Sequence, residues 1–167
     1  MGLFQSKLLG GESYVLNFMD DLSRMTFGYL IEHKDQTFDR FKDFNALVEN
    51  QIDLKIKMLR SINGGEYNNN EFNDYHTKYN IKRQFTIPYT PQQNSVIERK
   101  NMIIMDISRC MLGNLPCFLW GEAVSTVIYT LNRYLPKIIE GIFIIFFKTK
   151  TFPIFIIFNI YIFKSTL

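Results

Sequence analysis

The sequence predicts one α/β domain in which a mixed β-sheet is flanked by helices. Strand-like and helical periodicities alternate over residues 1–136, which is the usual order of elements in such domains. A chain of 167 residues with 47% hydrophobic and 21% charged residues can bury one core. Residues 1–136 are therefore expected to form the folded domain, and residues 137–167 a separate tail.

The domain is predicted to begin with a β-hairpin followed by a helix. Residues 14–19 (YVLNFM) and 25–31 (MTFGYLI) are strand-like, and the polar segment DDLSR joins them. From Asp35, which is the expected N-cap, apolar residues recur at helical spacing to about Ile52. The apolar positions of this helix are Phe38, Phe41, Phe44 or Leu47, and Val48.

Two short strands and a short helix are predicted next. Residues 55–59 form an alternating strand, and residues 70–79 a helix with Phe72 and Tyr75 on one face. Residues 81–87 form another strand, and the prolines of the following PYTP segment predict a rigid loop.

Two longer helices complete the predicted domain. The first covers residues 95–112, and Pro116 is expected to open the second. The apolar stripe of the first is expected at Ile97, Ile104, Ile107 and Met111, and that of the second at Phe118, Leu119, Ala123, Val127 and Leu131.

The tail, residues 137–167, is more than half isoleucine and phenylalanine. Its composition is typical of translated AT-rich DNA that was never selected as protein. The alternative is a membrane segment within residues 142–163, but Lys148 and Lys150 interrupt it and Pro153 follows. The charge-free stretch is shorter than the roughly 20 residues that a span needs. A β-prone segment such as PIFIIFNIYIF is also an aggregation hazard.

Charge and cysteine content limit the function classes only weakly. The net charge of +3 and pI near 8.8 permit a nucleic-acid partner without requiring one. Cys110 and Cys117 lie far from His33 and His76, so no zinc-site spacing is present. Neither a secretory signal nor a disulfide framework is indicated.

The segment PYTPQQNSVIERKN, residues 88–101, is the main candidate for chemistry. It places Glu98 about one turn into a predicted helix, behind a proline-stiffened loop. Amides and cations at a helix N-terminus suit phosphate and base contacts, although a solvated helix end is the simpler interpretation from physics alone. The polar neighbours of Glu98 are Gln92, Gln93, Asn94, Arg99 and Lys100.

The same segment closely resembles the third motif of copia-type (Ty1/copia) retrotransposon integrases, which are DDE strand transferases of the ribonuclease H-like fold. The resemblance covers residues 1 to about 136. Further blocks similar to that family occur in the family's order: FMDDLSR, FKDFNALVEN, KIKMLRSINGGEY, EFNDYHTKYNIKRQFTIPYTPQQN and LPCFLWGEAVSTVIYTLNR. The resemblance implies an integrase catalytic core from a Pol polyprotein, acting on DNA in the nucleus or cytoplasm. It implies no small-molecule substrate.

Integrases of this family hold two Mg²⁺ ions between two aspartates and a glutamate. Glu98 matches the glutamate. In the family, the second aspartate and the glutamate are separated by 35 residues, the number that separates Ile62 from Glu98 here. Ile62 therefore occupies the second aspartate position, and the first aspartate is expected just before Met1. This copy is consequently expected to be catalytically inactive, with Glu98 as a vestigial metal ligand and no productive Mg²⁺ binding.

Three other carboxylates are weaker candidates for the metal site. Asp20 and Asp21 match a different feature of the family, at the end of the second strand. Glu66 lies four residues beyond Ile62, on a polar turn where a solvated role is expected.

The resemblance also implies that the first, central strand of the sheet is largely missing. Its neighbours would then have unpaired backbone groups, each costing about 1–3 kcal/mol when buried. The domain is expected to be marginal or insoluble unless another segment fills the gap. The apolar tail could do so, although nothing in the sequence selects that pairing.

Three functions follow, in order of preference. The first is a remnant of a retrotransposon integrase core without activity, for which assembly into multimers on DNA ends is doubtful. The second is a non-enzymatic nucleic-acid-binding fragment. The third is a protein anchored to a membrane through its tail. Phosphate contacts in the second would come from Gln93, Asn94, Arg99 and Lys100, with Lys82 and Arg83 as further candidates.

Overall fold

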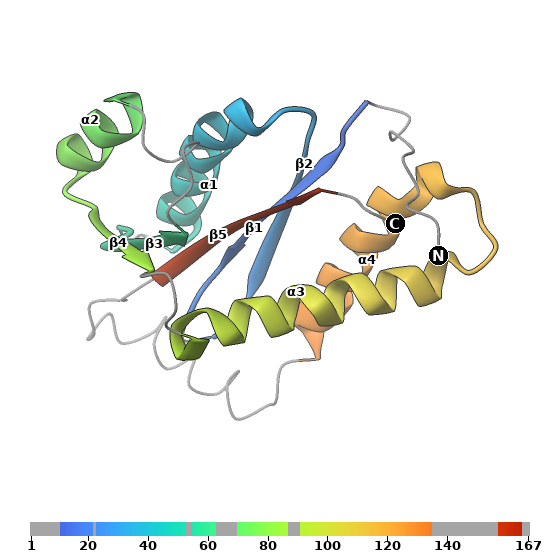
Figure 1. Cartoon of the computed structure of the whole chain (residues 1–167). Coiled ribbons are helices and arrows are strands. Elements are labelled where there is room, and N and C mark those ends of the chain that lie inside the picture. The colour runs from blue at the N-terminus through green and yellow to red at the C-terminus, as the bar shows by residue number, and fades with distance from the viewer. Residues whose placement is uncertain are drawn as a thin grey trace.

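The computed structural model shows a five-stranded mixed β-sheet with helices on both faces (Figure 1). This confirms the predicted fold class. The sheet has the strand order β2-β1-β5-β3-β4. The strands are β1 (Tyr14–Met19), β2 (Thr26–Ile31), β3 (Met58–Ile62), β4 (Lys82–Thr86) and β5 (Ile157–Lys164). The structure describes residues 11–21, 23–52, 55–62, 70–86, 91–134 and 157–164.

The first two strands form the predicted antiparallel hairpin. Its register pairs Tyr14 with Ile31 and Met19 with Thr26. The connecting turn is closed by Asp20, whose carboxylate accepts hydrogen bonds from the backbone N–H and the hydroxyl of Ser23, at 2.7 and 2.6 Å. Arg24 in the same turn has a φ of 60°.

The centre of the sheet is occupied by β5, a strand from the apolar tail. It runs antiparallel to β1 and parallel to β3. On the other side of β3, β4 is also parallel. The position that the resemblance predicts to lack a strand therefore contains residues 157–164.

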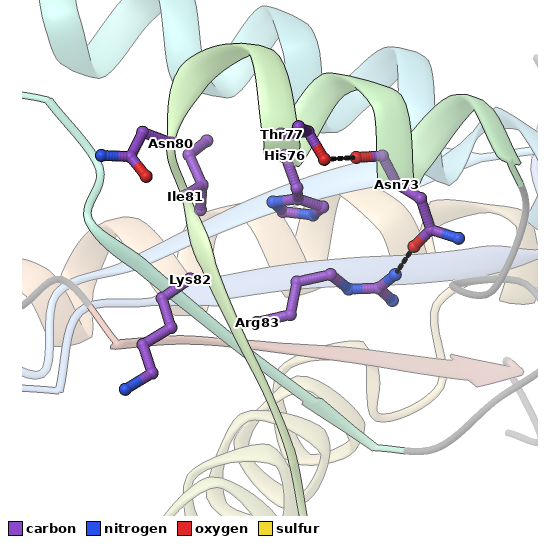
Figure 2. A pocket seen from close by; sticks show the side chains of 7 residues that line it. All are labelled: Asn73, His76, Thr77, Asn80, Ile81, Lys82 and Arg83. Carbon is purple, nitrogen blue, oxygen red and sulfur yellow. Dashed lines mark hydrogen bonds between the residues drawn. The ribbon is translucent and has the colours of Figure 1, made fainter.

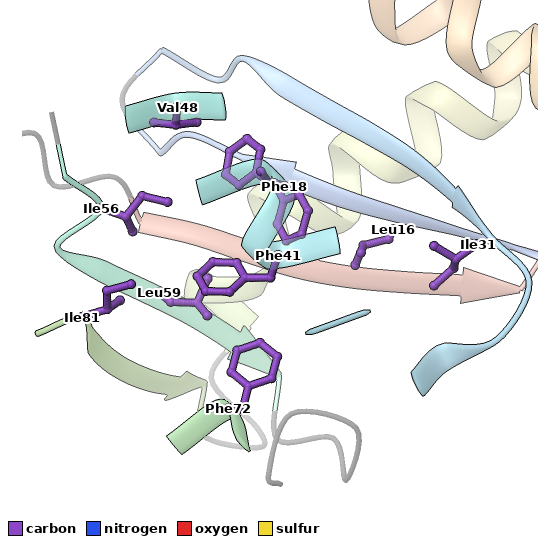
Figure 3. Close-up of a cluster of buried hydrophobic side chains, with 10 residues drawn as sticks. Leu16, Phe18, Ile31, Phe41, Val48, Ile56, Leu59, Phe72 and Ile81 are labelled. Atoms are coloured by element: carbon purple, nitrogen blue, oxygen red, sulfur yellow. The ribbon is translucent and has the colours of Figure 1, made fainter. Parts of the chain in front are cut away.

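In the described part of the chain, four α-helices cover the two faces of the sheet (Figure 1). They are α1 (Thr37–Ile52), α2 (Asn70–Tyr79), α3 (Pro91–Leu112) and α4 (Trp120–Arg133). On one face, Leu16 and Phe18 of β1 pack in a core with residues of α1 and α2 (Figure 3). On the other face, Val15 packs against α3 and α4. Successive side chains of a strand point to opposite faces, so β1 contributes to both cores.

Helix α1 begins later than predicted. A 3₁₀ turn at Lys34–Gln36 precedes it, and α1 itself starts at Thr37. Asp35 lies inside that turn rather than at an N-cap, because the Gln36 side chain accepts the backbone N–H groups of Glu32 and His33. Of the two alternatives for the third apolar position, Phe44 is buried and Leu47 is exposed.

The bounds of α2 agree with the prediction, whereas those of β3 and α3 differ. β3 spans Met58–Ile62 instead of residues 55–59, because its ladder with β4 and β5 begins only at Met58. α3 begins at Pro91, four residues before the predicted start. Proline is favoured in the first turn of a helix, where its missing N–H has no partner to lose.

The buried face of α3 is rotated relative to the predicted apolar stripe. Ile97 and Ile104 are buried as expected, but Ile107 and Met111 are 38% and 47% exposed. The centre of the buried face contains the polar residues Asn101 and Ser108. Ser108 donates a hydrogen bond to the Ile104 carbonyl at 2.7 Å, and Oδ1 of Asn101 accepts one from Nδ2 of Asn17 of β1 at 3.1 Å.

Helix α4 follows a 3₁₀ turn, Cys117–Leu119, that Pro116 precedes. Ala123 and Val127 are buried as predicted, but Phe118 is 38% exposed because it belongs to that turn. The other residues buried along α4 are Trp120, Gly121, Val124 and Ile128. No helix in the described ranges is both long and apolar enough to cross a membrane.

The contact between α4 and the hairpin depends on a glycine. A Cβ atom added to Gly28 of β2 would clash with Cδ1, the end of the Ile128 side chain. The missing side chain of Gly28 therefore lets Ile128 of α4 pack directly against the backbone of β2.

Candidate metal centre and nucleic-acid interface

The predicted metal site lies where β3 and β4 end and α3 begins. Ile62 is the last residue of β3 and pairs with Thr86, the last residue of β4. Four residues of chain separate Thr86 from Pro91, the first residue of α3. Ile62 is therefore paired with the strand that leads, over four residues of chain, into α3.

Glu98 lies farther along this helix than predicted. It is the eighth residue of α3, so about two turns separate it from the helix start. Its side chain is exposed. For Ile62 and for residues 91–95, which include Gln93 and Asn94, the structure describes the backbone alone.

The residues that the structure describes do not fit a centre for two divalent ions. Two-metal sites need several carboxylates converging on ions about 4 Å apart. Ile62 has a hydrocarbon side chain, and the sequence of β5, IFNIYIFK, contains no carboxylate. Among the described residues, no three histidine, cysteine or acidic side chains form a group that could hold a metal.

The two aspartates of the hairpin, Asp20 and Asp21, form hydrogen bonds and ion pairs with other protein groups. Asp20 accepts hydrogen bonds within its own turn. Asp21 forms ion pairs with Arg24 and, at 3.8 Å, with Arg60 of β3. Glu66 lies outside the described residues.

Arg99 and Lys100, the ninth and tenth residues of α3, provide positive charge more than two turns along the helix. The Arg99 side chain is exposed and that of Lys100 is half-buried. Burial lowers the pKa of Lys100, because a charged amine is less stable away from water. Within the part of the chain that is described, Lys100 has no hydrogen bond or ion pair. A bound phosphate would compensate this amine.

Lys82 and Arg83 lie on β4 beside a pocket of about 500 Å³ between this strand and α2 (Figure 2). Arg83 donates a hydrogen bond to Oδ1 of Asn73 at 2.6 Å, and its guanidinium lies 5.4 Å from the ring centroid of Phe72. Phe72 belongs to the core between the sheet and α1. Arg83 is thus on the opposite face of the sheet from α3, and the structure does not bring it together with Arg99 and Lys100.

The same pocket contains a buried histidine that the sequence analysis did not single out. His76 is 4% exposed, and its ring stacks on Phe72 at 5.1 Å and contacts Phe41 at 5.6 Å. Neither ring nitrogen has a hydrogen-bond partner among the described residues. Burial, and secondarily the charge of Arg83, lower the pKa of His76 to about 4. The spacing of Phe72 and His76, one helical turn apart, was the available signal for a shared face.

His76 should make the fold sensitive to mild acid. Its pKa is lower in the folded chain, about 4, than the ordinary 6.5, so the unfolded chain takes up the proton first as pH falls. Stability is therefore complete above pH 6.5 and declines toward pH 4. Between pH 7 and pH 5 the free energy of unfolding should fall by about 2 kcal/mol through this residue. Urea unfolding of the wild type and His76→Leu at both pH values measures the difference.

The matched control for this prediction is His33→Gln, since the side chain of His33 is 68% exposed. It should leave the pH dependence unchanged. An equal loss of stability at pH 5 in the wild type and in His76→Leu would contradict the assignment.

The sequence model of the Integrase core domain family matches residues 3–91, more than half of the chain. The chain belongs to the integrase core domain family. It is 44% identical over 134 residues, 79% of its length, to the "Retrovirus-related Pol polyprotein from transposon TNT 1-94" of Nicotiana tabacum. It is 34% identical over 122 residues, 72% of its length, to the transposon RE2 polyprotein of Arabidopsis thaliana. These matches confirm the resemblance to retrotransposon integrases.

This integrase core domain spans only about a tenth of those polyproteins, 10% and 8% respectively. Its fold is similar to the catalytic core domain of HTLV-2 integrase in complex with magnesium, with a TM-score of 0.58 and 19% identity over 79% of this chain and 82% of that chain. A simian T-cell lymphotropic virus intasome chain gives a TM-score of 0.62 at 19% identity, covering 79% of this chain and 46% of that one. These likenesses confirm the ribonuclease H-like fold.

Proposed function

We propose that this chain is a retrotransposon integrase core that binds nucleic acid and has lost strand transfer. The observation that carries the proposal is Ile62. It is the last residue of β3, and the 35 residues between it and Glu98 match the family's spacing between the second aspartate and the glutamate. An aliphatic side chain at this position removes metal binding there without removing the positive charge on the neighbouring helix.

Arg99 and Lys100 support the binding half of the proposal. The Arg99 side chain is exposed, and the half-buried amine of Lys100 has no counter-ion among the described residues. Contacts of this kind are made to phosphates and are independent of base sequence. Binding should therefore be sensitive to salt and weakly selective. Gln93 and Asn94 lie in the first turn of α3, and their side-chain amides would add contacts to the sugar-phosphate backbone of the bound nucleic acid.

The HTLV-2 relative carries magnesium, and the simian relative is part of an intasome. For this chain we propose neither productive Mg²⁺ binding nor assembly into multimers on DNA ends. The carboxylates required for the ion are not assembled by the described residues.

Replacing both cations tests the binding site. Arg99→Ala combined with Lys100→Ala should weaken binding to duplex DNA about tenfold at low salt, because two phosphate contacts are lost. The slope of log K against log salt should become shallower by roughly two. Fluorescence anisotropy with a labelled duplex at several salt concentrations measures both quantities.

The matched control is Arg40→Ala combined with Lys42→Ala on α1, which changes the net charge equally on the other face of the sheet. Both side chains are exposed and paired with aspartates of their own helix. This control should bind as the wild type does. Equal losses in both double variants would show that only net charge matters, and absent or salt-independent binding by the wild type would exclude the proposal.

A further inference from the structure

Among the described residues, the sheet consists of two halves that β5 alone connects through backbone pairing. β1 and β2 form an antiparallel pair, and β3 and β4 a parallel pair. In the strand order β2-β1-β5-β3-β4, β1 and β3 are not neighbours. Figure 1 shows β5, in dark red, between the labels of the two pairs.

The pairing of β5 is divided between its two ends. Residues 157–160 pair with Met58–Ser61 of β3, and residues 161–164 pair with Asn17–Tyr14 of β1. Without β5, the inner edges of both β1 and β3 would have unpaired N–H and C=O groups. β1 lies between two helical layers, where water cannot replace these partners.

Among the described residues, the apolar cores join the two halves on one face of the sheet only. The core beneath α1 includes Leu16 of β1 and Leu59 of β3. The buried residues of the opposite core come from β1, α3 and α4, and none of the described members belongs to β3 or β4. The ion pair between Asp21 and Arg60 adds a polar link at 3.8 Å. On the α3 side, the links between the halves that the described residues show are therefore the backbone pairing of β5 and this ion pair.

The composition of β5 is suited to this position. The segment IFNIYIFK is apolar at nearly every residue up to Lys164 and does not alternate between apolar and polar. Strands covered by helices on both faces have this continuous apolar pattern. The tail's high content of apolar residues, which is also typical of translated DNA never selected as protein, is therefore the composition that a strand at the centre of this sheet requires.

We propose that residues 157–164 act as a complementing strand, supplied by the chain's own tail, on which the folding of this domain depends. The acceptor is the slot between β1 and β3. It takes an extended segment that runs antiparallel to β1 and parallel to β3. The aggregation-prone tail segment is thereby used inside the fold.

Two proline variants of the full chain test the two halves of the slot separately. Proline removes a backbone donor and is excluded from central strands. Phe158→Pro should accelerate amide hydrogen exchange in β3, and Ile162→Pro in β1, each by about tenfold or more. The matched controls Phe158→Val and Ile162→Val keep the donor and should exchange like the wild type in β1 and β3. Exchange measured by mass spectrometry resolves the two strands.

Unfolding of the whole domain in both proline variants, with both valine variants folded, would support the proposal equally, because only the proline variants lose the backbone donor. Unchanged exchange in β1 and β3 of both proline variants would overturn it. Dilution distinguishes the source of the strand. Protection in β1 and β3 should be independent of protein concentration over a hundredfold range. Protection lost on dilution would show that a second copy supplies the strand, and would overturn assignment to the chain's own tail.

Discussion

The wild-type chain should show no measurable strand transfer of a DNA end with either Mg²⁺ or Mn²⁺. Loss of the ligands for one metal ion removes several kcal/mol of transition-state stabilisation, and each 1.4 kcal/mol is a factor of ten in rate. We expect a rate at least about a thousandfold below that of a metal-competent integrase of the family. Gel analysis of labelled DNA ends, with such an enzyme as the positive control, provides the measurement.

Restoring one carboxylate should not restore the reaction. Ile62→Asp places an acid at the end of β3, but β5 offers none beside it, so two ions are still not held. The matched variant Glu98→Gln removes the remaining acid of the predicted triad. Wild-type strand transfer that disappears in Glu98→Gln would contradict the proposal. Activity that survives this variant would come from a contaminant.

The elements that the sequence predicted well are those whose pattern is local. The hairpin of residues 14–31 and the helix of residues 70–79 follow from apolar spacing and turn residues, and both are present. The face of α3 could not be predicted in the same way. Asn101 lies at the centre of its buried face because Asn17, 84 residues away in sequence, donates to it. From sequence alone a polar residue is predicted to be exposed, because the distant hydrogen-bond partner that would allow its burial is not known.

In the candidate site, too, sequence spacing predicts some positions, whereas others depend on contacts between distant parts of the chain. The Ile62 position was predicted from its spacing to Glu98, and in the structure Ile62 ends β3 and pairs with Thr86 of β4. The separation of Arg83 from Lys100 depends on which face of the sheet each occupies, and sequence spacing does not encode that. The role of β5 could not be derived either, since any apolar strand satisfies the backbone of the slot.

The second large effect is expected in the core beneath α1. Phe44 is fully buried, and its ring stacks on Phe18 of β1 at 4.5 Å and contacts Phe27 of β2 at 5.1 Å. Phe44→Ala removes these contacts and leaves a cavity that neighbouring rings fill only partly. The free energy of unfolding should fall by about 3–5 kcal/mol, a large part of the roughly 5–15 kcal/mol of an ordinary domain. Urea denaturation followed by circular dichroism measures the loss.

Leu47→Ala is the matched control, because Leu47 lies less than one turn along α1 and is 38% exposed. Truncation there leaves no enclosed cavity, so the change should stay within about 0.5 kcal/mol. Phe44→Leu should fall between the two, since it keeps most of the apolar volume but loses the stacking on Phe18. Similar losses for Phe44→Ala and Leu47→Ala would mean that α1 does not pack on β1 and β2 through Phe44. The joining of the two sheet halves beneath α1 would then also need another explanation.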